Sequence, residues 1–161
     1  MRYLDPKSDL VFKRVFGEHA NILISFLNAM LPLDEGQVIE YLEYLPSELL
    51  PNLPILKNTV VDVRCKDNRG RQFIVEMQMI WSEIFKSRMV YNAAKTYVKE
   101  LDKGLEYKQL QPVYALAMVN QIFESDSQAF YHHYQMSHQS ITNRKLDDIH
   151  IIFVEIPKFR P

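Results

Sequence analysis

The stretch Asn58–Met79 reads NTVVDVRCKDNRGRQFIVEMQM, two β-prone runs joined by a short polar segment. Residues 67–70, DNRG, are typical of a hairpin turn. A three-residue loop commonly ends on a residue in the left-handed backbone region, which Gly70 adopts without steric strain. A loop that ends at Gly70 places Asp62 directly opposite Glu76 in the antiparallel pair. The sequence therefore predicts a β-hairpin with two facing carboxylates.

Side chains alternate between the two faces of a strand, so this register also divides the hairpin into two faces. Gln78 shares the face of Asp62 and Glu76. The opposite face is predicted to be core and carries Val61, Val63, Cys65, Phe73, Val75, Met77 and Met79. Cys65 is the only cysteine, which excludes an intrachain disulfide, and we expect it to be an inert buried thiol.

Two carboxylates directly across a strand pair repel each other and destabilise the pairing. The repulsion is relieved if a cation binds, if one acid takes up a proton, or if a basic side chain lies between them. Mg²⁺ suits such a pair, because it binds a few carboxylates and keeps waters or phosphate oxygens in its other positions. The backbone carbonyl of Met77, between Glu76 and Gln78, is a candidate further ligand. The alternative is an exposed face on which the acids pair with Arg64 or Arg71.

A helix is predicted to follow the hairpin, with Ser82 as its cap and its end near Asp102. One stripe of this helix is apolar and suited to the core: Trp81, Phe85, Met89, Ala93, Tyr97 and Leu101. Another stripe, at steps of three or four residues, is Ile84, Arg88, Tyr91, Lys95 and Val98. We expect Arg88, Tyr91 and Lys95 to face outward near the carboxylates and to hold the phosphates of a nucleic acid. A solvated helix face is the alternative.

The rest of the pattern predicts further helices and strands around this unit. Apolar residues at helical spacing indicate a helix or a broken helix pair over Asp9–Leu31, interrupted at Gly17. Runs of β-prone residues predict strands over Val38–Leu45, Pro112–Val119, Phe130–Met136 and Asp148–Ile156. This order of elements favours an α/β or α+β fold around a mixed sheet.

Length and composition narrow the class of protein. The chain has 161 residues, about one domain, and its 19 Lys and Arg against 20 Asp and Glu give a net charge of −1. A nucleic-acid-binding role must therefore rest on a local basic patch. The apolar runs are too short for a membrane helix and the start lacks the apolar core of a secretory signal, so a cytoplasmic protein with no membrane association is expected.

Other patterns that carry chemistry elsewhere do not indicate a second site. The four glycines are too scattered to form a phosphate-binding loop, which disfavours an ATPase or a Rossmann dehydrogenase. His132 and His133 are adjacent on a predicted strand and point to opposite faces, so they cannot easily share one metal ion. We interpret them as surface histidines.

The hairpin and the following helix resemble the PD-(D/E)XK nuclease superfamily. More closely, they are similar to its recombination-promoting nuclease (Rpn) or transposase branch. The resemblance rests on Asp62, Glu76-Met77-Gln78, Arg88 and Tyr91. The opening segment LDPKSDLVFKRVFG at 4–17 and the closing segment IIFVEIPKF at 151–159 are also similar to that branch. The resemblance therefore spans essentially the whole chain.

This resemblance implies a restriction-endonuclease-like αβββαβ core and a metal-dependent DNA endonuclease associated with recombination or transposition. Asp62 and Glu76 become ligands of Mg²⁺, for which Mn²⁺ can substitute, and Gln78 takes the place of the signature lysine. An amide forms hydrogen bonds but carries no charge. The sequence leaves open whether Lys95, Arg88 or another cation supplies the missing positive charge.

The resulting hypothesis is a single nuclease-like domain over residues 1–161 that cuts DNA. Members of this branch are often longer, so the chain is also consistent with the N-terminal part of a longer protein. The alternative function is a catalytically inactive module of the same fold that binds DNA or a protein partner, and a nuclease that acts only when assembled is a third. The oligomeric state stays open, although a homodimer would make cutting both strands of a duplex simpler.

Overall fold

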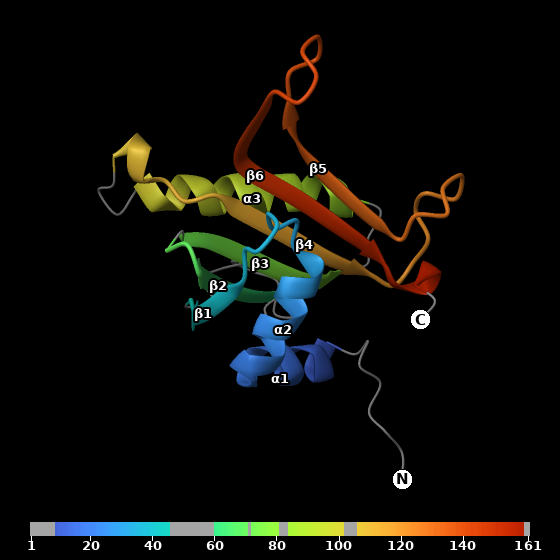
Figure 1. The fold of residues 1–161 in the computed structure, drawn as a ribbon. Coiled ribbons are helices and arrows are strands. Elements are labelled where there is room, and N and C mark those ends of the chain that lie inside the picture. Colours follow the sequence, from blue (N-terminus) through green and yellow to red (C-terminus); the bar gives the residue numbers. More distant parts are fainter. Residues whose placement is uncertain (1–8, 46–59, 71, 81–83, 102–105, 160–161) are drawn as a thin grey trace.

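The computed structural model describes residues 9–45, 60–70, 72–80, 84–101 and 106–159. Within these residues the chain forms three α-helices and one six-stranded sheet (Figure 1). The helices are α1 (Asp9–Glu18), α2 (Ala20–Met30) and α3 (Phe85–Leu101). The strands are β1 (Ile39–Tyr44), β2 (Val60–Asp67), β3 (Gln72–Ile80), β4 (Val113–Val119), β5 (Tyr131–Ser137) and β6 (Lys145–Glu155). Two short 3-10 turns are η2 (Tyr107–Gln109) and η3 (Ile156–Lys158).

The sheet is mixed, in the order β1-β2-β3-β4-β6-β5. Strands β1, β2 and β3 pair antiparallel, β3, β4 and β6 pair parallel, and β5 returns antiparallel along the β6 edge. The parallel step from β3 to β4 needs a crossover, which α3 provides. The predicted α/β class with a mixed sheet is confirmed.

The register of the β2–β3 hairpin is the predicted one. Asp62 pairs with Glu76 across the two strands. The turn closes with the backbone N–H of Gly70 donating to the Asp67 carbonyl at 3.0 Å, and Gly70 has a φ of 76°. The loop length and the glycine thus fix which residues face each other.

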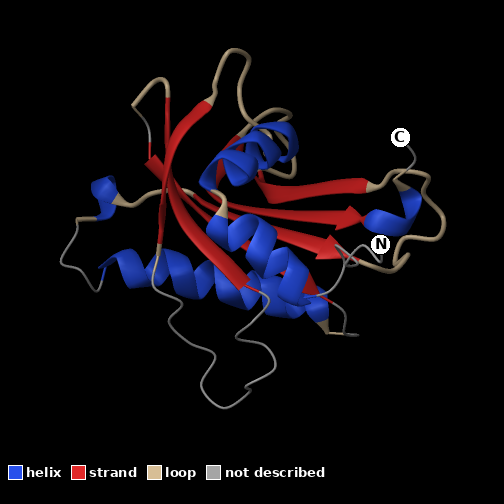
Figure 2. Ribbon diagram, turned by 90° about the horizontal axis from the view of Figure 1, so that it is seen from below, coloured by secondary structure: helices blue, strands red, loops and turns tan. Residues whose placement is uncertain are grey.

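Helices cover both faces of the sheet (Figure 2). On one face α1 and α2 pack on the apolar residues of the hairpin, with Phe12, Leu23 and Leu27 against Cys65 and Met77. Burial raises the pKa of the Cys65 thiol to about 12, which agrees with the inert thiol expected from the sequence.

The other face carries a second core beneath α3. The buried stripe Phe85, Met89 and Ala93 of α3 packs on residues of β4 and β6, among them Ala117 and Phe153. Since α3 lies over β4 and β6, the β2–β3 hairpin lies beside this helix. None of the described helices is both long and apolar enough to cross a membrane.

Two boundaries differ from the sequence prediction. The N-terminal helix pair breaks at His19 (φ −126°, ψ 86°), and Gly17 stays inside α1. Strand β6 begins at Lys145, earlier than predicted, because β5 extends its antiparallel pairing to this polar segment. The predicted caps at Ser82 and near Asp102 lie outside the described residues.

The turn glycine provides a test of the hairpin. Gly70→Ala should lower the free energy of unfolding by about 1–2 kcal/mol, because alanine is strained at positive φ. An added Cβ would contact nothing within 4 Å, so backbone strain is the only cost. Gly17→Ala is the matched control and should stabilise the protein by about 0.5–1 kcal/mol, because alanine favours the helix. Denaturant unfolding measures both, and an unchanged Gly70→Ala variant would contradict the assigned turn.

Candidate active site

The two facing acids lie on the α3 side of the sheet. Glu76 on β3 pairs with Asp62 on one side and with Ala115 of β4 on the other. Gln78 pairs in the same way with Ala117, so small side chains adjoin both polar positions. The side chains of Glu76 and Gln78 lie outside the described residues, whereas their backbone register is described. The polar positions of β2 and β3 therefore lie next to β4, on the face of the sheet that carries the second core.

Asp62 is the described acid of this pair, and its charge is poorly compensated. Its carboxyl oxygen Oδ1 is fully buried and accepts no hydrogen bond from the described residues. Burial raises the pKa of the Asp62 carboxyl from 3.8 to about 6, and the positive charge of Lys99 partly opposes this rise. A buried acceptor without a donor is costly unless a ligand satisfies it.

The donor set at this position fits a hard divalent cation. A carboxylate oxygen that lacks a hydrogen bond, beside a second acid in register, is the oxygen-rich pairing that Mg²⁺ binds. The Met77 carbonyl lies between Glu76 and Gln78, while the Met77 side chain is buried on the opposite face. Among the described side chains, no three His, Cys, Asp or Glu residues gather closely enough to hold a metal.

The basic flank of α3 faces this hairpin. On the opposite flank, the hydroxyl of Tyr97 donates to the carboxylate of Asp148 in β6 at 2.8 Å. Arg88, Lys95 and Lys99 lie on the other side of the buried stripe and are all partly buried, so this flank points towards β3 and β2. The electrostatic interaction of Lys99 with Asp62 agrees with this orientation.

The three predicted phosphate-contacting residues of α3 therefore divide into two groups. Arg88 and Lys95 share the flank that points to the acids. Tyr91 lies further round the helix, 63% exposed, and faces solvent. Lys99 was not predicted, although its position four residues after Lys95 puts it on the same flank.

Comparison with known families now bears on this geometry. The chain matches the family described as PD-(D/E)XK nuclease family transposase over residues 6–161. The chain belongs to this family. The resemblance and the restriction-endonuclease-like fold class drawn from the sequence are thereby confirmed. Comparison with curated proteins finds no match, and comparison with solved structures finds none either.

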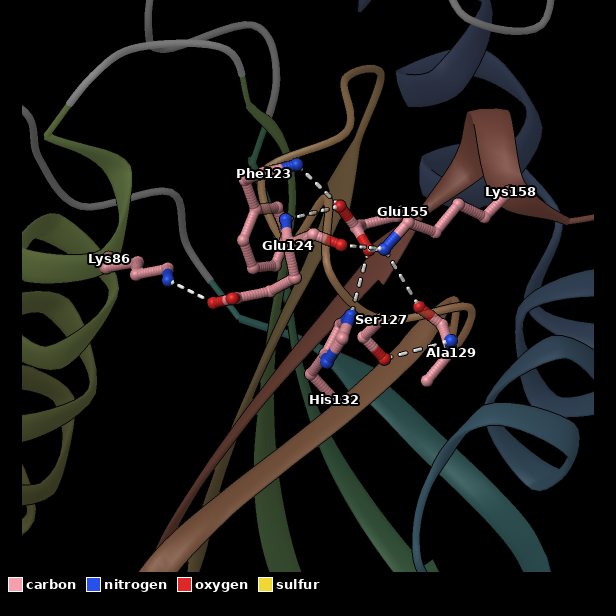
Figure 3. Close-up of polar contacts among 8 residues, drawn as sticks. All are labelled: Lys86, Phe123, Glu124, Ser127, Ala129, His132, Glu155 and Lys158. Carbon is pink, nitrogen blue, oxygen red and sulfur yellow. Dashed lines mark hydrogen bonds and ion pairs between the residues drawn. The ribbon is translucent and has the colours of Figure 1, made fainter.

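This PD-(D/E)XK family member also has a buried ionic cluster at the carboxyl edge of its sheet (Figure 3). Glu155, at the end of β6, is fully buried and forms an ion pair with Lys158. His132 Nε2 lies 2.9 Å from its carboxylate, and the backbone N–H groups of Phe123 and Glu124 donate to the same carboxylate. Burial alone would raise the pKa of Glu155, but these hydrogen bonds outweigh it and lower the pKa to about 2.

Both carboxylate oxygens of Glu155 have partners, so we expect the cluster to stabilise the fold. The ammonium of Lys158 also donates to the carbonyls of Glu124 and Ala129, which ties η3 to the loop before β5. The prediction of surface histidines is wrong for His132, whose side chain is only 12% exposed, whereas His133 is partly exposed. They do point to opposite faces, but His132 joins the Glu155 cluster and His133 Nε2 lies 2.9 Å from Nδ1 of the buried His150.

The pH dependence of stability tests the charge state of Asp62. Its pKa is raised on folding, so the stability that its proton contributes is full below pH 3.8 and is lost as the pH rises through about 6. Without metal at pH 8, Asp62→Asn should therefore be more stable than the wild type by roughly 1–3 kcal/mol in the free energy of unfolding. This difference raises its melting temperature by several degrees. The difference should vanish near pH 3.

The exposed Asp126 supplies the control, since Asp126→Asn should give the same small difference at both pH values. Equal melting temperatures for wild type and Asp62→Asn at pH 8 would show that the Asp62 charge is compensated within the fold.

The Glu155 cluster predicts an opposite pH profile. Glu155→Gln should cost about 3–5 kcal/mol at neutral pH, because it leaves the ammonium of Lys158 buried without its counter-charge. Because folding lowers the pKa of Glu155, this stabilisation is present above pH 4.5 and is lost as the pH falls towards 2. Glu124→Gln removes only the partly exposed pair with Lys86 and should cost less than about 1 kcal/mol. Chemical unfolding at several pH values measures both, and equal costs would refute the assigned role of Glu155.

Proposed function

We propose that this chain is a divalent-metal-dependent endonuclease that hydrolyses DNA phosphodiester bonds. Its membership of a nuclease family supports a nuclease-type role. The observation that carries the finer proposal is the buried Asp62 oxygen that lacks a donor among the described residues, on a strand position opposite Glu76. A structural acid would be hydrogen-bonded, as Glu155 is. A buried acid that lacks hydrogen-bond partners is suited to binding a ligand.

Asp62, Glu76 and the Met77 carbonyl would hold Mg²⁺ or Mn²⁺. When bound, such a cation supplies a water of lowered pKa and neutralises the charge that develops on the phosphate. Gln78, two residues beyond Glu76 on the same face, would orient the attacking water through its amide. The neighbouring β4 positions, Ala115 and Ala117, carry small side chains that are buried in the second core.

The α3 flank would supply the positive charge that Gln78 lacks. Of the cations on this flank, Lys99 is the one whose charge acts on Asp62, so we assign it this electrostatic role in preference to Lys95 or Arg88. Arg88 and Lys95 would instead bind phosphates of the DNA backbone, with Tyr91 adding a hydrogen bond or a stacking contact. Such contacts position DNA without reading its sequence, and with a net charge of −1 for the whole chain they depend on this local group of cations.

A second candidate is the catalytically inactive module that binds DNA or a protein partner. Gln78 stands where the superfamily pattern has a lysine, and an amide carries no charge, so the choice between the two candidates depends on whether another cation supplies that charge. An association with recombination or transposition, a cytoplasmic location and a single domain over residues 1–161 stay predictions.

Plasmid nicking in Mg²⁺ or Mn²⁺ separates the two candidates. Asp62→Asn and Glu76→Gln should each lower the nicking rate by roughly 10²–10³-fold, the usual loss when a preorganised charge is removed from an active site. Glu43→Gln, an exposed acid on β1, is the control and should nick like the wild type. Manganese binding, followed by electron paramagnetic resonance, should weaken in the same two variants.

Equal nicking by all four proteins would reject the assigned acids. DNA binding with no metal-dependent nicking by the wild type would favour the inactive module.

A further inference from the structure

The outer face of α3 is apolar although it faces solvent. Ile84, just before the helix, is 65% exposed, and Val90, Tyr91 and Val98 are 53%, 63% and 54% exposed. Ile84, Tyr91 and Val98 recur every seven residues and, with Ser87, Ala94 and Leu101, form a stripe at alternating steps of three and four residues. We call these six residues the outer seam. Their spacing is that of the a and d positions of a heptad.

The outer seam is distinct from the face that holds α3 on the sheet. That inner face is the stripe Phe85, Met89 and Ala93, which is already buried in the second core. A surface helix normally has one apolar stripe, towards its own core, and polar residues elsewhere. A second stripe on the solvent side, apolar except for Ser87, is suited to an interaction surface.

We propose that the outer seam binds the outer seam of a second copy of this chain, with the two helices antiparallel. In this arrangement a positions face d positions of the other helix. Ile84 then meets Leu101 of the second copy, and Tyr91, the largest residue of the seam, meets Ala94, one of its smallest. Ser87 likewise meets Val98. Tyr91 and Val98 thus each face a small residue, which is how interdigitated layers reach native packing density. The large residues Ile84 and Leu101 meet at the two ends of the seam.

Parallel pairing of two copies is excluded by the same residues. It would place Tyr91 against Tyr91 and Ala94 against Ala94, so that overfilled and empty layers would alternate. The order of large and small side chains along the outer seam therefore matches a second copy of itself only when the two helices are antiparallel. This match is the reason for proposing a second copy as the partner.

The dimer would also arrange charge. Arg88 and Lys95 both follow d positions of the seam, so the antiparallel pair brings these cations of both copies together along one edge. Val90 and Tyr97 lie on the other edge. The basic edge is the flank that points towards Asp62, so the two proposed sites would lie along one continuous basic strip. In the dimer the ring of Tyr91 packs in the seam, and its hydroxyl stays available for a phosphate.

Analytical ultracentrifugation of the full chain tests the dimer without reference to activity. The wild type should pass from monomer to dimer as its concentration rises, and added salt should strengthen the dimer by screening the like charges of Arg88 and Lys95. Val98→Glu should shift the equilibrium to monomer, because it buries a charge in the seam. Leu146→Glu is the matched control, an exposed apolar residue (60%) on β6, and should dimerise like the wild type. A wild type that stays monomeric at every concentration would overturn the proposal.

Disulfide trapping tests the direction of the helices. Residues 87 and 98 of one helix are about 16 Å apart along its axis, whereas a disulfide needs Cα atoms within about 7 Å. A mixture of Ser87→Cys and Val98→Cys should therefore cross-link under mild oxidation, and neither variant alone should. The native Cys65 is buried with a raised pKa and should not interfere. Cross-linking of each variant with itself, or of neither in the mixture, would contradict the antiparallel seam.

Discussion

The buried Asp62 oxygen Oδ1, which accepts no hydrogen bond from the described residues, is the constraint on which the proposed site depends. The turn at Gly70 fixes the hairpin register, the register places Asp62 opposite Glu76, and burial beside the second core then makes the Asp62 charge costly. Nothing described around Oδ1 satisfies that oxygen, although Lys99 contributes a positive charge nearby. In such a setting a cation lowers the energy of the folded state and gains a preformed oxygen ligand.

The hairpin was predictable because local rules decide it. A three-residue loop with a terminal glycine and a period of two along each strand fix both the partner of Asp62 and the face of Cys65. The inner stripe of α3 followed for a similar reason, since Phe85 and Met89 recur at helical spacing. The family resemblance added the roles of the acids, which spacing alone left open between a metal site and an ion-paired face.

Long-range partners were not predictable, because no local pattern reports them. Lys99 acts on Asp62 only because α3 crosses the sheet over β4 and β6. The sequence places Glu155 in a predicted strand but does not indicate its partner. Its contact with His132 depends on β5 pairing with β6. The break at His19 likewise follows from how α1 and α2 pack, whereas glycine propensity pointed to Gly17.

Two acids of this fold lie in contrasting environments. Glu155 is buried with both carboxylate oxygens bonded and has a lowered pKa, whereas Asp62 has one buried oxygen that accepts no hydrogen bond from the described residues and has a raised pKa. The most direct measurement of this difference is the pKa of the Asp62 carboxyl by ¹³C NMR, with and without Mg²⁺. The account predicts a pKa near 6 without the ion and a pKa below the ordinary 3.8 when the ion is bound. A pKa close to 3.8 that Mg²⁺ does not change would contradict it.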